Sequence, residues 1–185
     1  MSRRGPARRT ARGRPWPPTP PAPRPPASAK RSAGAPLEPV LPPTAPLIAD
    51  SGALYALYDA DDLFHEAVRE VVAGHRGPVV VPAVLLAEVD YLLREFLGVD
   101  AELDFLRSLE SGAFALEPFT GADLARCREL VARYRDLDLG LADAGVVATA
   151  ERLRTRHLLT LDERDFRAIA PAGGQPFVIL PADAG

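Results

Sequence analysis

From residue 47 onwards, apolar residues follow two alternating patterns along the chain. Five short runs are almost entirely apolar, whereas the stretches between them repeat apolar residues every three or four positions. The first pattern is typical of strands buried on both faces, and the second is typical of amphipathic helices. The predicted strands cover residues 46–50, 78–82, 113–119, 157–161 and 176–180.

The stretches between the strands predict helices, and several carry recognisable start and stop signals. Pro82 suits the first turn of a long helix over 83–97, and Gly98 ends it. Asp100 and Thr120 are the predicted N-caps of the next two helices. The remaining predicted helices cover residues 53–59, 63–75 and 141–154. Strands that alternate with helices predict an α/β fold, here a three-layer α/β/α domain with a five-stranded parallel sheet over residues 47–185.

Residues 1–46 show neither pattern. They contain 14 of the 20 prolines, and nine arginines and lysines against one acidic residue, for a net charge of +8. Because they have few aliphatic side chains to bury, they cannot offset the entropy lost on ordering the backbone. We predict a disordered, basic, proline- and arginine-rich leader, with a basic arm for RNA as the alternative. The domain at 47–185 has 13 arginines and 24 acids, for a net charge of −11.

Composition excludes several other classes of protein. The single cysteine, Cys127, excludes an intramolecular disulfide and a cysteine-based zinc site, and it suits the reducing cytoplasm. The one lysine, Lys30, lies in the leader, so the domain has neither a P-loop lysine nor a Schiff-base lysine. No run of about 18 apolar residues is present, so the sequence predicts no membrane span.

Four carboxylates stand in unusual places. Asp50 and Asp162 follow the first and fourth predicted strands, and the carboxyl ends of parallel strands share one edge of a sheet. Glu88 and Asp143 lie in predicted helices, with apolar neighbours three and four residues away. Each acid also has an ordinary interpretation: Asp50 and Asp162 as helix caps, Asp143 as an acid that the helix dipole favours in a first turn, and Glu88 as the partner of an arginine elsewhere in the chain.

If these carboxylates converge at one sheet edge, they cannot all stay ionised without a cation. Oxygen ligands favour a hard divalent ion, and Mg²⁺ or Mn²⁺ fits this set best. An acidic site of this kind supports metal-assisted hydrolysis of phosphodiesters. The sequence therefore predicts a metal-dependent nuclease site.

Four segments, in this order, resemble PIN-domain ribonucleases, and most closely the VapC toxins of bacterial toxin–antitoxin pairs. They are IADSGAL (48–54), PAVLLAEVDYLL (82–93), LADAGVVATA (141–150) and LLTLDERDF (158–166). The resemblance implies a five-stranded parallel sheet and an Mg²⁺- or Mn²⁺-dependent endoribonuclease. It also implies a homodimer that is neutralised by a small antitoxin. The leader departs from the compact family pattern.

The resemblance also implies roles for individual residues. The three principal acids of the family match Asp50, Glu88 and Asp143. The fourth acidic position varies within the family and matches Asp162, with Asp165 as a substitute. Hydroxyl residues that support the site match Ser51 and Thr160.

Two alternatives remain open: a PIN nuclease of RNA processing, and a degenerate PIN domain that binds RNA or protein. The latter would be expected to have lost acids, and all four are present. For the toxin, the apolar segment 53–74 is a candidate antitoxin surface, with packing on the sheet or homodimer formation as the alternative. Arginines of a dimer groove would offset the negative charge toward RNA; candidates are Arg94, Arg126, Arg133 and Arg135. Asp90 is expected to pair with Arg94 across one helical turn.

Overall fold

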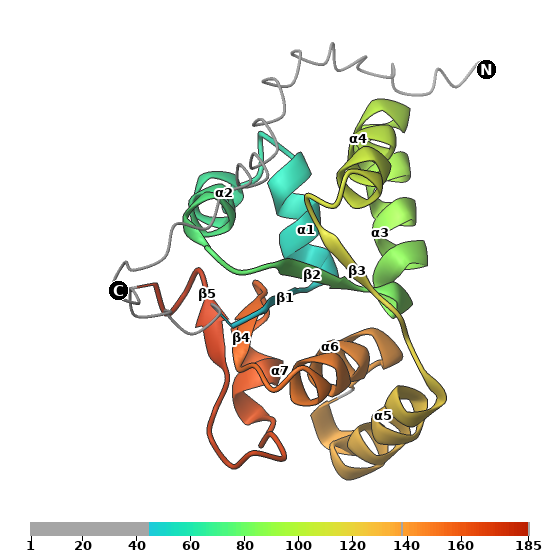
Figure 1. The fold of residues 1–185 in the computed structure, drawn as a ribbon, viewed down its shortest axis with the longest axis vertical. Helices are drawn as coiled ribbons and strands as arrows, with labels where there is room; N and C mark the ends of the chain where they lie inside the picture. Colours follow the sequence, from blue (N-terminus) through green and yellow to red (C-terminus); the bar gives the residue numbers. More distant parts are fainter. Residues whose placement is uncertain (1–44, 138, 185) are drawn as a thin grey trace, which may run out of the picture. The chain divides into compact units, whose positions relative to one another are not determined.

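The structure is a computed structural model that describes residues 45–137 and 139–184. The predicted disordered leader lies outside the described residues. Within them, five parallel strands form one sheet, as the sequence predicts, and their order in the sheet is β3-β2-β1-β4-β5 (Figure 1). Each strand is shorter than its apolar run; the bounds are Leu47–Ala49 (β1), Val79–Pro82 (β2), Ala115–Glu117 (β3), His157–Leu159 (β4) and Val178–Leu180 (β5).

Helices cover both faces of the sheet, which confirms the predicted three-layer architecture (Figure 1). One face carries α1 (Ser51–Tyr58), α2 (His65–Gly74), α3 (Leu86–Leu92) and α4 (Val99–Glu110). The other face carries α5 (Gly121–Arg133), α6 (Leu141–Arg152) and α7 (Glu163–Ala168). Among the described residues, no helix combines the length and the apolar character needed to cross a membrane.

The core lies on both sides of the central strand. All three residues of β1 are fully buried, and so are Leu158 and Leu159 of β4. Helix α6 is the most deeply packed helix, because every residue from 144 to 150 is buried. Gly145 allows this close packing, since a Cβ atom there would lie 2.5 Å from Cγ1 of Val84. Gly145 therefore lets α6 pack closely against η1, which contains Val84.

The predicted helix over 83–97 has the expected extent but three successive forms. A 3₁₀ turn, η1 (Ala83–Leu85), leads into α3, and a π-helical turn, η2 (Leu93–Leu97), follows it. Gly98 ends the helix with φ +95°, a left-handed conformation that favours glycine. The predicted N-cap at Asp100 is wrong: α4 starts at Val99 directly after Gly98, so Asp100 lies in its first turn. Thr120 caps α5 as predicted.

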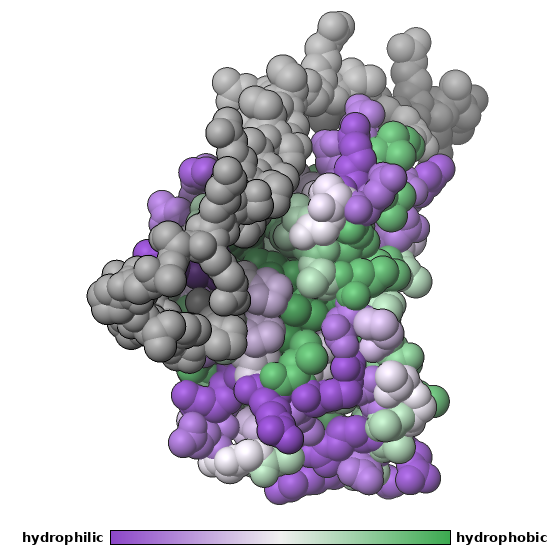
Figure 2. Space-filling model, viewed as in Figure 1, coloured by the Kyte–Doolittle hydropathy of each residue, from purple (hydrophilic) through white to green (hydrophobic). Residues whose placement is uncertain are grey.

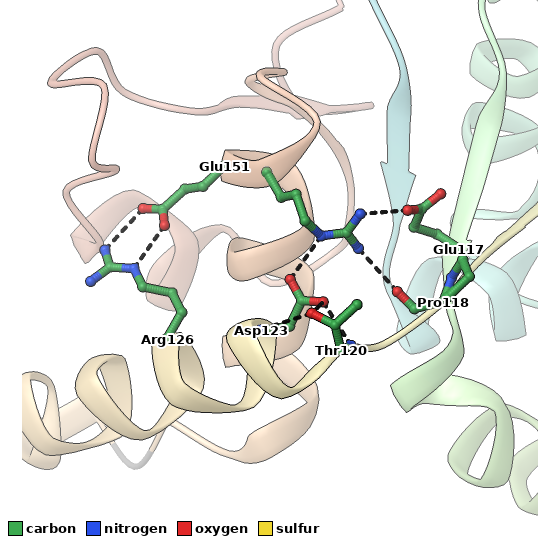
Figure 3. Close-up of polar contacts among 7 residues, drawn as sticks. Glu117, Pro118, Thr120, Asp123, Arg126 and Glu151 are labelled. Atoms are coloured by element: carbon green, nitrogen blue, oxygen red, sulfur yellow. Dashed lines mark hydrogen bonds and ion pairs between the residues drawn. The ribbon is translucent and has the colours of Figure 1, made fainter.

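A polar network joins α5, α6 and β3 (Figure 3). The Arg152 guanidinium donates from Nε to Asp123 at 2.8 Å and from Nη1 to Glu117 at 2.5 Å. Burial alone would raise the pKa of Asp123, but hydrogen bonds from Thr120 and Arg152 outweigh burial and lower it. Asp123 of α5 therefore stays ionised and binds Arg152 of α6.

Two arginines, Arg94 and Arg126, form ion pairs with acids of other helices. Arg126 binds both carboxylate oxygens of Glu151, at 2.8 and 3.0 Å. Arg94 binds Glu102 at 2.7 Å, so the predicted ion pair with Asp90 is wrong, because Glu102 on the facing helix α4 competes for the same guanidinium. Each of these guanidinium groups pairs with an acid of the domain, and the expectation that the arginines line a dimer groove toward RNA stays a prediction.

Candidate active site

The predicted acids gather where the direction of the strand order reverses. Strands β2 and β3 lie on one side of β1, whereas β4 and β5 lie on the other. The chain leaves β1 at Asp50 and β4 at Thr160, and the amide of Asp50 donates to the carbonyl of Leu159 at 2.9 Å. In open α/β sheets, ligands bind outside the carboxyl ends of the strands at this switch point.

Asp50 is held by two donors at the start of α1. Its Oδ1 accepts from the Ser51 amide at 2.8 Å, and its Oδ2 accepts from Thr160 Oγ1 at 2.9 Å. The residue is only 6% exposed. Burial, with smaller effects from the charges of Asp143 and Glu88, raises the pKa of Asp50 to about 6 against the lowering effect of the two hydrogen bonds. Asp50 is thus both a helix cap and a desolvated acid beside two others.

Glu88 lies in the first turn of α3, and its Oε1 accepts from Ser51 Oγ at 2.7 Å. Its side chain is exposed, so the prediction that it sits within the apolar stripe of its helix is wrong. The reason is its place at the edge of the sheet, where a long side chain can leave the stripe and reach Ser51. Glu88 also acts on the pKa values of Asp50 and Asp143, which places its charge in the site.

Asp143 lies at the start of α6, and its Oδ2 accepts from the Gly140 amide at 3.0 Å. Because Gly140 has no side chain, this is only half of a capping box. Burial raises the pKa of Asp143 despite that hydrogen bond, and the charges of Asp162, Glu88 and Asp165 raise it further. Asp143 therefore lies in the first turn of α6 beside other acids, and its assignment to a metal site stays a prediction.

Asp162 and Asp165 lie at the start of α7, the helix that follows β4. Asp162 caps α7 by accepting from the Asp165 amide at 3.0 Å, and its own amide donates to Thr160 Oγ1 at 3.1 Å. The Thr160 hydroxyl therefore connects Asp162 to Asp50. Oδ1 of Asp165 is buried and accepts no hydrogen bond, and Arg164 Nε lies 3.5 Å from it.

The donor chemistry of the cluster fits a hard cation. Its polar atoms are carboxylate oxygens, neighbouring acids raise the pKa of Asp50 and that of Asp143, and one buried oxygen of Asp165 accepts no hydrogen bond. As their side chains stand, no three His, Cys, Asp or Glu residues of the described segments are placed to hold a metal ion. Both oxygens of Asp50 and one of Glu88 instead face amide or hydroxyl donors. Rotation of the exposed Glu88 side chain would free it to join the other acids.

Comparisons with known proteins agree with this arrangement. Residues 47–171 match the model of the PIN domain family. Ribonuclease VapC26 of Mycobacterium tuberculosis is 42% identical over 135 residues, which cover 73% of this chain and all of that protein. The crystal structure of Mycobacterium tuberculosis VapC20, a sarcin–ricin loop cleaving toxin, matches with a TM-score of 0.62 and 20% identity, over 66% of this chain and 94% of that chain. The last similarity is one of fold.

Proposed function

Because the chain belongs to the PIN domain family, we propose that it is a metal-dependent endoribonuclease that acts as the toxin of a toxin–antitoxin pair. One observation carries the proposal: Asp50 follows β1, Glu88 lies in α3 and Asp143 lies in α6, and the charges of Asp143 and Glu88 raise the pKa of Asp50 at the switch point of the sheet. The 42% identity to Ribonuclease VapC26 supports RNA as the substrate. Action on cellular RNA implies a cytoplasmic location.

We assign metal binding to the four acids, Asp50, Glu88, Asp143 and Asp162. A bound Mg²⁺ or Mn²⁺ would lower the pKa of a coordinated water and neutralise charge on the phosphate. The protein's own contribution is to hold the carboxylates in place. Thr160 fixes one oxygen of Asp50, and Ser51 orients Glu88. Asp165, whose buried Oδ1 accepts no hydrogen bond and lies 3.5 Å from Arg164 Nε, is the substitute for Asp162.

The proposed partners are RNA, a second copy of the chain in a homodimer, and a small antitoxin. A basic side chain of the antitoxin would pair with the acidic site, since a guanidinium binds two carboxylate oxygens at once. The structure narrows the apolar docking surface expected over residues 53–74. Leu54 and Leu57 are buried in the core and cannot contribute, whereas Leu63 is 90% exposed and Phe64 is also exposed. Co-expression with an adjacent small gene tests the pairing.

The decisive experiment maps cleavage of cellular RNA by the purified full-length protein with Mn²⁺, with Mg²⁺ and with EDTA. We expect cuts at defined unpaired sites that require a divalent ion and disappear in EDTA. Cleavage that persists in EDTA would contradict the metal site. A protein that binds Mn²⁺ but cuts no RNA would instead favour the degenerate binding module. A nuclease of RNA processing would differ from the toxin by having no neutralising partner.

A further inference from the structure

Three aromatic side chains, Tyr55, Tyr91 and Phe96, form a cluster on the helical layer that carries Ser51 and Glu88. The ring centre of Phe96 lies 6.3 Å from that of Tyr55 and 6.5 Å from that of Tyr91, and its plane is nearly perpendicular to both. Tyr91 is 60% exposed and Phe96 is 62% exposed. Figure 2 shows apolar residues gathered over the region where α3 lies in Figure 1. Adjacent aromatic rings left in water indicate a binding surface.

This aromatic cluster lies one helical turn from the candidate active site. Tyr55 follows Ser51 by four residues in α1, and Tyr91 follows Glu88 by three residues in α3. Residues with this spacing share a helix face, about 5.4 Å apart along the axis. Ser51 Oγ donates to Glu88 Oε1 at 2.7 Å, so helices α1 and α3 meet at the candidate active site. The aromatic cluster lies one helical turn further along both helices.

The π-helical turn η2 explains why Phe96 joins the cluster. In a regular α-helix, residues five apart point in directions that differ by about 140°. In η2, the Gly98 amide donates to the carbonyl of Leu93, five residues earlier, at 2.9 Å. This wider turn brings Phe96 back over the face that carries Tyr91, while Leu93 stays fully buried. Single π-helical turns are frequent at functional sites.

The charges around the cluster disfavour contacts to phosphate. The Tyr55 hydroxyl donates to Asp59 at 3.2 Å. Burial, together with the charges of Asp59 and Asp62, raises the pKa of Tyr55, so its ring stays neutral. The sequence from residue 47 onwards carries a net charge of −11, which repels the RNA backbone. Base stacking on aromatic rings does not require positive charge on the protein, so it can supply affinity here.

We propose that the aromatic cluster binds one unpaired nucleobase of the RNA substrate, next to the phosphate at the carboxylate site, by stacking on one of the two exposed rings, Tyr91 or Phe96, while the other, nearly perpendicular ring contacts the edge of the base. This inference rests on the proposed function, because it places the base relative to the bond that is cut. A nucleobase is favoured over a protein segment because the cluster continues directly from Ser51 and Glu88, where the phosphate of the same nucleotide would lie. The cluster would thereby restrict cleavage to unpaired RNA.

The kinetic test uses the RNA that the wild-type protein cuts. Tyr91→Ala and Phe96→Ala should each raise KM about 5- to 100-fold, the range expected for loss of one stacked base, with kcat within about twofold. The loss should be equal in low and high salt, because stacking releases few counterions. Phe96→Tyr should restore the wild-type KM. Leu124→Ala, a residue 53% exposed on α5 across the sheet, is the matched control and should change nothing.

Removing single bases from the RNA locates the contact. One abasic position beside the cut should raise the KM of the wild-type protein as much as Phe96→Ala does, with no additional loss in Phe96→Ala itself. If every abasic RNA behaves alike in both proteins, the proposal is wrong. It is also wrong if Tyr91→Ala and Phe96→Ala keep the wild-type KM but escape inhibition by a co-expressed antitoxin, since the cluster would then be a protein-binding surface.

A binding experiment without cleavage tests this proposal independently of the proposed function. Asp50→Asn full-length protein is titrated with a single-stranded oligonucleotide that contains 2-aminopurine, whose fluorescence falls when it stacks. Quenching that is lost in Asp50→Asn combined with Phe96→Ala supports the stacking site, even if the wild-type protein cuts no RNA. Equal quenching with and without Phe96 would overturn it, even if cleavage is confirmed. Circular dichroism should show the same thermal unfolding for the singly and doubly substituted proteins.

Discussion

Asp50 makes the free energy of unfolding depend on pH. Its pKa rises from an ordinary value of 3.8 to about 6 through burial, so the folded state holds a proton between these values that the unfolded chain releases. The free energy of unfolding therefore falls as the pH rises from about 4 to above 6. Integrated over this window, the loss from Asp50 is on the order of 1–3 kcal/mol.

Asp50→Asn should remove this loss. Measured by urea unfolding in EDTA, the variant should gain stability over the wild-type protein above pH 6, and the two should converge near pH 4. Asp61→Asn, at an exposed position, is the control and should track the wild type. A constant difference between Asp50→Asn and the wild type at all pH values would show that Asp50 is not protonated in the folded state.

Asp143→Asn should abolish cleavage while the fold stays intact. The amide keeps the shape of the side chain and the acceptor for the Gly140 amide, but it removes a charge from the acidic cluster. Since burial and three other acids raise the pKa of Asp143, the melting temperature should hold or rise slightly. Cleavage mapping and a thermal melt check this, with Asp100→Asn as a matched exposed control. Full activity of Asp143→Asn would exclude this residue from the site.

At the residue scale, the sequence was sufficient to nominate the acids but not their contacts. Apolar spacing marked Glu88 as unusual, and the strand ends marked Asp50 and Asp162. The exposure of Glu88 was missed, because periodicity reports which helix face a residue occupies and not how far a long side chain reaches. The amide of Gly140 was missed because a glycine carries no side-chain signal.

Among the elements, the packing of α6 depends on one missing methyl group. A Cβ atom at Gly145 would lie 2.5 Å from Cγ1 of Val84, and a β-branched side chain has little freedom to move away. Gly145→Ala should therefore lower the free energy of unfolding by about 1–3 kcal/mol, despite the better helix propensity of alanine. Thermal or urea unfolding measures the change.

Gly121→Ala in α5 is the matched helical control, because nothing lies within 4 Å of a Cβ atom at that position. It should leave stability unchanged or raise it slightly. If Gly145→Ala behaves like Gly121→Ala, then η1 can shift away from α6, and the close approach of these two elements does not set the position of Asp143.

Arg152 joins α5 to α6 and β3, and its removal should be costly. Arg152→Met would leave the Asp123 carboxylate, 3% exposed, with Thr120 as its remaining hydrogen-bond partner. Breaking a buried pair from one side costs about 3–5 kcal/mol, and about 1–3 kcal/mol is expected here because Arg152 is partly exposed. Urea unfolding at pH 7 measures it. Arg167→Met removes two exposed ion pairs, with Glu163 and with Asp183, and should change little.

Element types and order were predictable from the sequence, whereas local helix geometry was not. Runs of apolar residues and helical periodicity identified every strand of the sheet. The π-helical turn η2 was missed, because a pattern with 3.6 residues per turn does not reveal a local widening. For that reason the pairing of Tyr91 with Phe96, five residues apart, has no signal in the sequence.

For the whole domain, strand order determines which acids meet. The predicted parallel sheet implied a shared carboxyl edge, but not which strands are neighbours. With β1 between β2 and β4, Asp50 and Asp162 follow adjacent strands, and Thr160 can contact both. Had β4 lain at the far edge beyond β3, the same sequence motifs would not have formed one site.

The start of the domain is tied to the strand layer through two backbone carbonyls. Thr155 Oγ1 donates to the Pro46 carbonyl at 2.6 Å, and His75 Nε2 lies 3.0 Å from the Ala45 carbonyl oxygen. Residues 1–44 precede both contacts and carry a net charge of +8. A deletion of 1–44 therefore keeps every described hydrogen bond at this end of the domain, whereas a deletion of 1–46 removes two.

We expect the protein without residues 1–44 to melt within about 2 °C of the full chain and to cut RNA at the same sites with a similar rate, because every core residue of the described segments is kept. The protein without residues 1–46 should melt several degrees lower, since Thr155 and His75 lose their acceptors, and about 1 kcal/mol corresponds to roughly 2–4 °C in a chain of this size. Calorimetry of both proteins beside the full chain checks this. A large fall in melting temperature after deletion of 1–44 would show that the leader packs on the domain. Unchanged melting with a KM that rises mainly at low salt would instead identify the leader as a basic arm for RNA, because phosphate contacts weaken as salt increases.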